Sequence, residues 1–295
     1  MTIVPILLGA LSVAVTFDDL PCNPAEGATV ERQNSINGAI VATLKERSIP
    51  AVGFVNESRL TDRAVLALWL DAGLDLGNHT FSHPDLHQVG AAKFLEDVVL
   101  GDRVTREMLE ARGRSIRWFR HPFLHTGLDL DTKGLVETFL AARGLKVAPV
   151  TIDNSEWIFA RAYLRADEAK DAAARGKIAD AYVAYMEAKT DYCERQARAL
   201  FGRDIPQVLL VHANRLNADH FGRIASMLAA RGYTFVSLEA ATADAAYASR
   251  DTYVGRGGIT WLHRWALGSG RTDAVVPNEP ETPAWILKAA GLDAE

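Results

Sequence analysis

Two adjacent carboxylates, Asp18 and Asp19, end the stretch Ser12–Phe17, in which larger apolar residues alternate with smaller ones. This alternation predicts a buried strand, and Leu20-Pro21 then turns the chain away. Neighbouring carboxylates at the end of a buried strand repel each other, and burial makes their ionisation costly. Capping of the next helix would account for one aspartate better than for two. A metal ion, a cationic partner or a reaction would account for both.

His79 and His83 lie four residues apart, a spacing at which one helical turn would point both imidazoles at one ion. The spacing alone is weak, because two surface histidines often share it. Thr80 stands where a zinc protease carries its glutamate, so that mechanism lacks its base. Pro84 disfavours helix at His83, so His87 need not share the same face. With one aspartate, the two imidazoles would form a three-ligand site with an open position, as in catalytic zinc centres that activate water.

Two further polar side chains follow predicted strands. Arg120 suits a bidentate clamp on a carboxylate, with a surface arginine as the alternative. His212 ends the apolar stretch 208–211, where a lone histidine is more often a hydrogen-bonded core residue than a catalyst. Four other histidines carry no comparable signal and are interpreted as surface or structural residues: His121, His125, His220 and His263.

Alternating strands and helices would bring these residues together. Apolar stretches predict further strands over 51–55, 74–78, 116–119, 146–152, 207–211 and 233–236. Helical spacing predicts helices over 36–47, about 91–112, about 133–142 and 219–230, and Thr61 is a possible cap for another helix that ends at Gly73. This alternation predicts a parallel α/β fold, a closed or nearly closed barrel. Nearly every polar cluster follows a strand, where such barrels place their chemistry.

The composition is that of a globular protein that can bury a large core. The chain has 295 residues, of which 48% are hydrophobic and 23% charged. This length suits two average domains or one α/β barrel. The net charge of −5 gives no basic surface for nucleic acid. Cys22 and Cys193 are too few for a disulfide scaffold, and the sequence leaves open whether they pair.

The first residues have two interpretations. The apolar run Ile3–Val15 is too short to span a bilayer, so no stable transmembrane segment is predicted. The run resembles the apolar part of a signal peptide, yet no basic residue precedes Arg32, and cleavage near Ala14 would remove the first strand. We interpret Met1–Leu11 as a truncated leader or as a lead-in to the strand. We expect a periplasmic, secreted or cell-envelope location, with a cytoplasmic one as the alternative.

Two segments lie outside the alternation. An insertion at about 160–205 is rich in alanine and charge, and Gly176 is expected to break it into two helices. Its apolar stripe predicts packing against the barrel, with a wall of the substrate groove as the alternative: Ile178, Tyr182, Tyr185, Tyr192 and Leu200. The tail 251–295 contains three tryptophans, which are expected to cover the bottom of the barrel, with stacking on sugars as the alternative: Trp261, Trp265 and Trp285. We predict one domain, 12–250, with this extension packed on it.

Five motifs follow one another in a recognisable order: Thr16-Phe17-Asp18-Asp19, His79-Thr80-x-x-His83, Arg120-x-Pro122-Phe123, Asp153-x-x-Glu156-Trp157 and Leu210-Val211-His212. Over about residues 12–240 the chain resembles the polysaccharide deacetylase family, the NodB-homology domain of carbohydrate esterase family 4. The resemblance implies an irregular (β/α)7 barrel.

The resemblance also implies site residues. Asp18 would be the general base, His212 the general acid, and Asp19, His79 and His83 the ligands of a divalent metal, usually zinc. Arg120 would orient Asp18, and Glu156 would orient His212. The remaining residues would shape the substrate pocket: the backbone N–H of Phe123 at the oxyanion, Leu210 and Trp157 as walls, and Asp153 beside them.

Four residues depart from the family pattern: Leu20 where glycine is usual, His121 and Leu124 in the arginine motif, and Glu156 in place of aspartate. These departures leave the metal ligands intact and bear on the shape of the groove. The predicted function is metal-dependent removal of acetyl groups from an N- or O-acetylated glycan or a smaller acetylated compound. One alternative is a metal-independent cyclic-amide hydrolase, although such relatives tend to lose the ligands. Another is a non-catalytic glycan-binding protein, which would be expected to lack Asp18 or His212.

Overall fold

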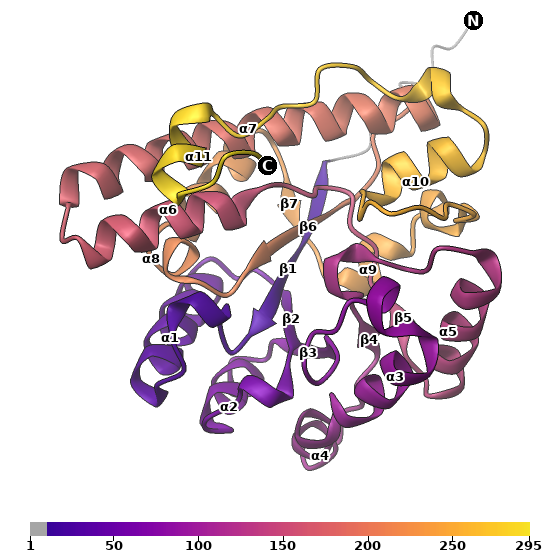
Figure 1. The fold of residues 1–295 in the computed structure, drawn as a ribbon, viewed down its shortest axis with the longest axis horizontal. Helices are drawn as coiled ribbons and strands as arrows, with labels where there is room; N and C mark the ends of the chain where they lie inside the picture. The colour runs from indigo at the N-terminus through magenta and orange to yellow at the C-terminus, as the bar shows by residue number, and fades with distance from the viewer. Residues whose placement is uncertain (1–10) are drawn as a thin grey trace, which may run out of the picture.

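The computed structural model describes residues 11–295, and its centre is a curled sheet of parallel strands (Figure 1). The strands are β1 (Ser12–Leu20), β2 (Ala51–Val55), β3 (Asp75–Asn78), β4 (Trp118–Phe119), β5 (Lys146–Val147), β6 (Gln207–His212) and β7 (Thr234–Phe235). Their order is β5-β4-β3-β2-β1-β6, and β7 pairs with the start of β1. The parallel α/β fold predicted from the sequence is therefore confirmed.

The segment after β5 brings the two ends of this sheet together. Sequence predicts one strand over 146–152, but only its first two residues pair with β4. Pro149 has no N–H to donate, so it interrupts a ladder. Beyond it, the N–H groups of Thr151 and Ile152 both reach the carbonyl of Val208 at 3.0 Å, and Ile152 bridges Leu209 on β6. The sheet thus curls from β5 round to β6.

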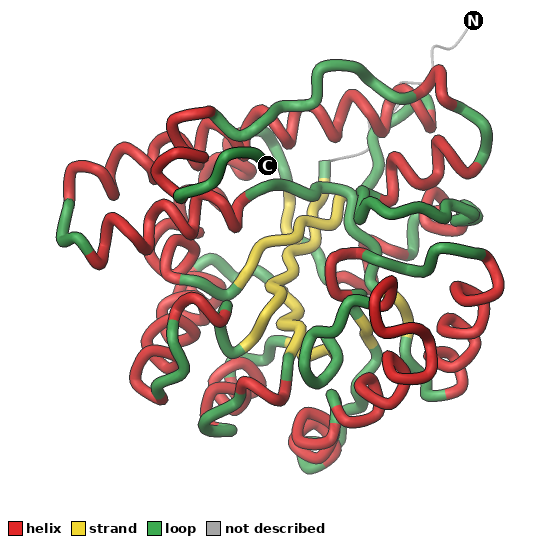
Figure 2. The backbone as a smooth tube through the Cα atoms, in the orientation of Figure 1, coloured by secondary structure: helices red, strands yellow, loops and turns green. Residues whose placement is uncertain are grey.

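Helices surround the sheet (Figures 1 and 2). They are α1 (Val30–Glu46), α2 (Ala64–Asp71), α3 (Leu86–Leu100), α4 (Arg103–Glu110), α5 (Leu130–Ala142), α6 (Glu156–Glu168), α7 (Ala172–Phe201), α8 (Arg215–Ala230), α9 (Leu238–Thr242), α10 (Trp261–Gly268) and α11 (Ala284–Ala290). On β1, Phe17 packs edge-on against Trp69 of α2 at 5.7 Å and against Phe221 of α8 at 5.0 Å. Burying each such ring contributes about 1.5–3 kcal/mol, which fixes β1 at the centre.

The helix predicted over about 91–112 is two helices, α3 and α4. The break falls at Gly101, where a Cβ would lie 2.4 Å from the carbonyl carbon of Thr80. Only glycine lets the chain pass this close to the loop that follows β3. The same loop is held to α3 by Asp97, whose carbonyl accepts from the Phe81 N–H at 3.1 Å and whose carboxylate accepts from the Ser82 hydroxyl at 2.7 Å.

Two local predictions are wrong. Gly176 lies inside α7 and does not break it, since one glycine in a long helix costs only about 1 kcal/mol. The break falls earlier, at Lys170 with φ 56°, and the Asp171 side chain caps α7. Thr61 does not cap α2, because its hydroxyl donates to the Gln33 side chain at 2.6 Å.

The insertion and the tail pack together. Helix α6 contacts both α7 and α11 (Figure 1). The predicted apolar stripe of α7 is buried except for Leu200, which is half-buried. In the tail, Trp261 and Trp265 are buried. The backbone N–H of Trp261 donates to the Val150 carbonyl at 2.7 Å. Trp285 is 38% exposed, so it is not buried as the other two tryptophans are.

Three further predictions concern the chain as a whole. Within residues 11–295, no helix is both long and apolar enough to cross a bilayer. Cys22 and Cys193 are buried free thiols in this described part of the chain. The proposed leader Met1–Leu11 lies outside the described residues, apart from Leu11 at its end.

Candidate active site

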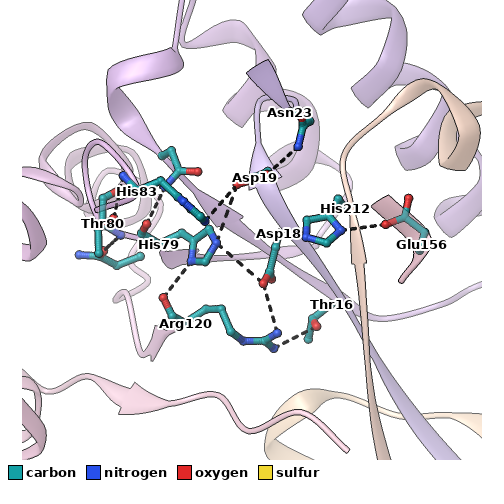
Figure 3. Close-up of polar contacts among 12 residues, drawn as sticks. Thr16, Asp18, Asp19, Asn23, His79, Thr80, His83, Arg120, Glu156 and His212 are labelled. Carbon is teal, nitrogen blue, oxygen red and sulfur yellow. Dashed lines mark hydrogen bonds and ion pairs between the residues drawn. The ribbon is translucent and has the colours of Figure 1, made fainter. Parts of the chain in front are cut away.

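A groove of about 1470 Å³ opens at the carboxyl ends of the strands. Nine of the eleven predicted site residues line it: Asp18, Asp19, His79, His83, Phe123, Asp153, Trp157, Leu210 and His212. The other two, Arg120 and Glu156, are fully buried behind it, and their side chains contact Asp18 and His212 of the groove, respectively (Figure 3). The structure therefore brings every predicted site residue to one place.

Asp19, His79 and His83 form a candidate metal site. Asp19 Oδ1 lies 3.6 Å from His83 Nε2 and 3.9 Å from His79 Nε2. Ligand atoms about 2 Å from a tetrahedral zinc ion lie roughly 3.3 Å apart, so small side-chain shifts would close the cluster on an ion. The predicted helical turn is absent, because Thr80 and His83 have φ of 67° and 61°. A loop with left-handed residues converges the two imidazoles instead.

The protonation states of this cluster fit a metal ion. His79 Nδ1 donates to the Arg120 carbonyl at 2.8 Å, which leaves the Nε2 lone pair facing both aspartates, 3.8 Å from Asp18 Oδ2 and 3.9 Å from Asp19 Oδ1. Burial and the neighbouring His83 hold the pKa of His79 well below its usual value, and burial lowers the pKa of His83. Burial alone would raise the pKa of Asp19, but Arg59 and His83 hold it well below its usual range. Two neutral imidazoles and a carboxylate suit zinc and related divalent ions.

Two residues that sequence reasoning missed hold the Asp19 carboxylate. Arg59 Nη1 lies 2.8 Å from its Oδ1, and Asn23 Nδ2 donates to its Oδ2 at 3.1 Å. Arg59 comes shortly after β2, whose carboxyl end lies beside that of β1. Its position after a strand is the signal that could have identified it.

Asp18 has the environment of a general base. Arg120 reaches its Oδ2 through Nη1 at 3.3 Å and donates through Nη2 to the Thr16 hydroxyl at 3.0 Å, so the predicted bidentate clamp is a single contact. Asp18 Oδ1 is buried and has no hydrogen-bond partner among the described residues. Burial raises the pKa of Asp18 to about 6, although Arg120 and His212 oppose the shift. The free oxygen is therefore available to accept a proton near neutral pH.

His212 is not a simple core histidine. Its Nδ1 lies 2.8 Å from Oε2 of Glu156, a fully buried carboxylate. Burial opposes protonation, but the Glu156 carboxylate outweighs it and raises the pKa of His212 to about 9. The imidazole is therefore protonated at neutral pH. With Nδ1 on Glu156, Nε2 is the nitrogen left to donate a proton in the groove.

The family comparison agrees with this geometry. Residues 9–133 match the model of the family described as polysaccharide deacetylase. This segment, less than half of the chain, therefore matches a polysaccharide deacetylase domain. The matched segment contains the metal cluster, Asp18 and Arg120, whereas Glu156 and His212 lie beyond it and are placed by the geometry.

One curated relative is similar to half of this chain. A chitooligosaccharide deacetylase from Sinorhizobium fredii is 31% identical over 150 residues. The match covers 50% of this chain and 61% of the relative, so the chain spans less than two thirds of that protein.

Solved structures share the fold of the deacetylase domain. A polysaccharide deacetylase from Bacillus cereus aligns with a TM-score of 0.50 at 18% identity, over 77% of this chain and 91% of that one. A pseudoenzyme of carbohydrate esterase family 4 from Bacillus anthracis aligns with a TM-score of 0.51 at 14% identity, over 79% of this chain and 66% of that one. A mutant of that pseudoenzyme has restored activity. The fold thus occurs with and without activity, and the site residues must decide between the two.

Aromatic and acidic side chains wall the groove. Phe123 is 54% exposed and Trp157 is 42% exposed, which leaves both rings open to a ligand. The Phe123 ring lies edge-on to His83 at 4.6 Å. Leu210 is buried at the floor, and Asp153 is half-buried beside it. Aromatic faces of this kind can pack on the apolar faces of sugar rings.

A second cluster beside the groove is a poor metal site. Asp85, His87 and His125 lie close enough to share an ion. However, the two imidazole rings are stacked 4.0 Å apart with their planes only 10° from parallel. Lone pairs in parallel planes cannot converge on one ion. His125 Nδ1 instead lies 2.7 Å from Asp85 Oδ1, so the cluster fits a structural hydrogen-bonded pair.

Proposed function

We propose that this protein is a metal-dependent deacetylase that hydrolyses the acetamide group of an N-acetylated glycan. One observation carries the proposal. Asp18 and His212 line the same groove as the metal cluster, one with an unpartnered carboxylate oxygen and the other as an imidazolium. Base and acid thus stand beside the ligand set with pKa values on opposite sides of neutrality, which is the arrangement that general acid–base catalysis needs.

The mechanism divides the proton transfers between these two residues. Asp19, His79 and His83 would hold the divalent ion, zinc in our proposal, which supplies activation of water and polarisation of the carbonyl. Asp18 Oδ1 accepts the proton of the attacking water, and Arg120 orients that carboxylate. His212 Nε2 donates a proton to the leaving nitrogen as the C–N bond breaks. One water and one acetamide give acetate and a free amine. The backbone N–H of Phe123 is the proposed second donor to the oxyanion.

The charge of the groove favours neutral glycans. Five carboxylates besides Asp18 and Asp19 line it: Asp153, Glu279, Glu281, Asp293 and Glu295. The cationic side chains in its lining are already paired, Arg59 with Asp19, Lys189 with Glu279 and His212 with Glu156. An anionic glycan would meet net repulsion there. A neutral N-acetylglucosamine oligosaccharide would not, and the name of the Sinorhizobium relative supports this substrate class.

We propose residues 12–250 as the catalytic domain and 251–295 as an extension that completes the groove. The lining includes residues of both parts, among them His212 and Glu281. The apolar run near the start supports a place of action outside the cytoplasm, which would give access to envelope or extracellular glycans. Fractionation of native cells that finds the protein only in the cytosol would defeat this part of the proposal.

Acetate release tests the function. Purified protein is assayed on neutral chitooligosaccharides, peptidoglycan, acetylated xylan and a cyclic amide, with and without a chelator, and Asp18→Asn serves as the inactive control. We expect acetate from the neutral oligosaccharides, abolished by chelation and restored by zinc. Hydrolysis of the cyclic amide in metal-free protein would support the metal-independent alternative. Binding to a glycan without any acetate release would support the binding-protein alternative.

A further inference from the structure

The carboxylate of Glu156 is fully buried, and the only ion-pair partner that the described residues offer it is His212. No lysine or arginine reaches it in this part of the chain. Two side-chain amides compensate. Asn217 Nδ2 donates to Oε1 at 2.9 Å, and Asn214 Nδ2 donates to the same oxygen. A buried carboxylate is tolerated only when such donors satisfy it. Because both amides occupy Oε1, Oε2 is the oxygen that faces His212.

The orientation of the Asn217 amide is fixed from both sides. Its Nδ2 donates to Glu156 and also to the His212 carbonyl at 2.9 Å. Its Oδ1 accepts from the Tyr182 hydroxyl at 2.8 Å. A flipped amide would turn its oxygen toward two acceptors and its nitrogen toward the tyrosine. The two acceptors therefore select the orientation in which Asn217 donates to Glu156, and the Tyr182 hydroxyl anchors the amide oxygen on the other side.

These contacts join four elements that are distant in the sequence. Glu156 begins α6, His212 ends β6, and Asn217 lies in the first turn of α8. Asn214 caps α8 through its Oδ1, which accepts from the Asn217 N–H at 2.9 Å, and this leaves its amide nitrogen for Glu156. Tyr182 is fully buried on α7, the long helix of the insertion. The insertion thus contacts the residues behind His212 through the Tyr182 hydroxyl.

We propose that Tyr182 and Asn217 are positioning residues for His212, so that the helical insertion forms part of the proton-donating half of the active site. The proposal rests on the proposed function, and the length of the Glu156 side chain supports it. Glutamate has one more rotatable bond than aspartate. A longer carboxylate needs extra anchoring to hold one oxygen on the imidazole, and the two asparagines supply it.

Two variants and one matched control test the proposal. Asn217→Leu keeps the approximate volume and removes both donor contacts, and Tyr182→Phe removes one hydroxyl. The control is Tyr233→Phe, which also removes a buried hydroxyl bonded to a side chain of α7, that of Glu194 at 3.1 Å, away from the groove. Each variant is assayed on an N-acetyl substrate and on an acetate ester with a good leaving group, as a function of pH. Thermal melts report folding.

We expect Asn217→Leu to lower kcat on the acetamide by roughly 10- to 100-fold, with KM little changed and the ester rate nearly normal. In the pH profile of Asn217→Leu on the acetamide, the fall in kcat at high pH should begin at a lower pH than in the wild type. Tyr182→Phe should change the same quantities by a smaller factor, and Tyr233→Phe should change none. Equal losses on amide and ester, with an unmoved basic limb, would reduce Asn217 to a structural residue. If Tyr182→Phe has the same rates and pH profile as the control Tyr233→Phe, the insertion has no part in positioning His212.

A measurement on metal-free protein separates this proposal from the proposed function. The ring nitrogens of His212 are followed by ¹⁵N NMR through a pH titration, which needs no turnover. We expect the His212 titration to move to lower pH in Asn217→Leu and, less, in Tyr182→Phe. If the wild-type protein releases no acetate but these shifts occur, the function is wrong and the positioning stands. If acetate is released but His212 titrates identically in all variants, the positioning is overturned.

Discussion

Asp18 and His212 are direct partners across the pairing of β1 with β6. The proposed base and the proposed acid therefore stand side by side on neighbouring strands. Asp18 must be ionised to accept a proton, and burial raises its pKa to about 6. His212 must be protonated to donate one, and Glu156, working against burial, raises its pKa to about 9. The two residues define a pH window in which both are in the active state.

The rate of deacetylation should follow this window as a bell. Activity is expected to fall below about pH 6 as Asp18 is protonated, and above about pH 9 as His212 loses its proton. A bound divalent ion would move the acidic limb to lower pH, because its charge favours the ionised carboxylate. Initial rates between pH 4 and 11 check the prediction. A flat profile through pH 9 would remove His212 as the acid.

Replacing Asp18 should separate the base from the metal ligands. Asp18→Asn keeps the size of the side chain and should lower kcat on the order of 10²–10⁴-fold. The metal content should stay near that of the wild type, because Asp19, His79 and His83 remain. Asp19→Asn is the comparison and should lose most of the ion. Metal analysis after gel filtration decides, and loss of metal from Asp18→Asn instead would mean that the roles of the two aspartates are reversed.

Replacing His212 should affect amides more than activated esters. An amine leaving group needs a proton, whereas a good ester leaving group does not. His212→Ala should therefore cost on the order of 10²–10⁴-fold on an acetamide and far less on an activated acetate ester. Both rates are measured on the same preparation. Near-normal turnover of the acetamide would return His212 to the role of a core histidine.

The His212–Glu156 pair should also appear in the pH dependence of stability. A histidine whose pKa is raised from 6.5 to about 9 on folding stabilises the protein fully below pH 6.5, and this contribution is lost as the pH rises through 9. The shift corresponds to about 3 kcal/mol. In metal-free protein, the free energy of unfolding in urea should fall by that order between pH 6.5 and 10. Glu156→Gln should lack most of this fall, and an equal fall in both proteins would contradict the pairing.

Groove charge should control the choice between glycans. Glu281 lines the groove and has no ion-pair partner within residues 11–295. Glu281→Gln should raise kcat/KM on an anionic acetylated glycan by a few-fold at low salt and leave a neutral chitooligosaccharide unchanged. The gain should shrink at high ionic strength. An equal effect on both substrates would show that Glu281 acts through the shape of the groove.

The sequence predicted the site better than the path of the chain around it. Apolar alternation located β1 and β2, and the five motifs named residues that the structure gathers in one place. The loop that carries His79 and His83 could not be anticipated, because left-handed φ values at non-glycine residues arise from tertiary contacts rather than local preference. Arg59 and Asn217 carry no motif, and only the fold brings them to Asp19 and Glu156.

Gly101 shows how far the site's requirements extend. It lies outside the groove, on the outer side of the loop that carries the metal ligands, and its missing side chain is the space that the Thr80 backbone occupies. Any larger residue there would push that loop, so loss of metal binding can originate at a position that touches neither metal nor substrate. A mutational library limited to groove residues would therefore omit a position that supports the loop of the proposed ligands His79 and His83. In an inactive homologue with all five motifs intact, the residue equivalent to Gly101 is the first place to look for the cause.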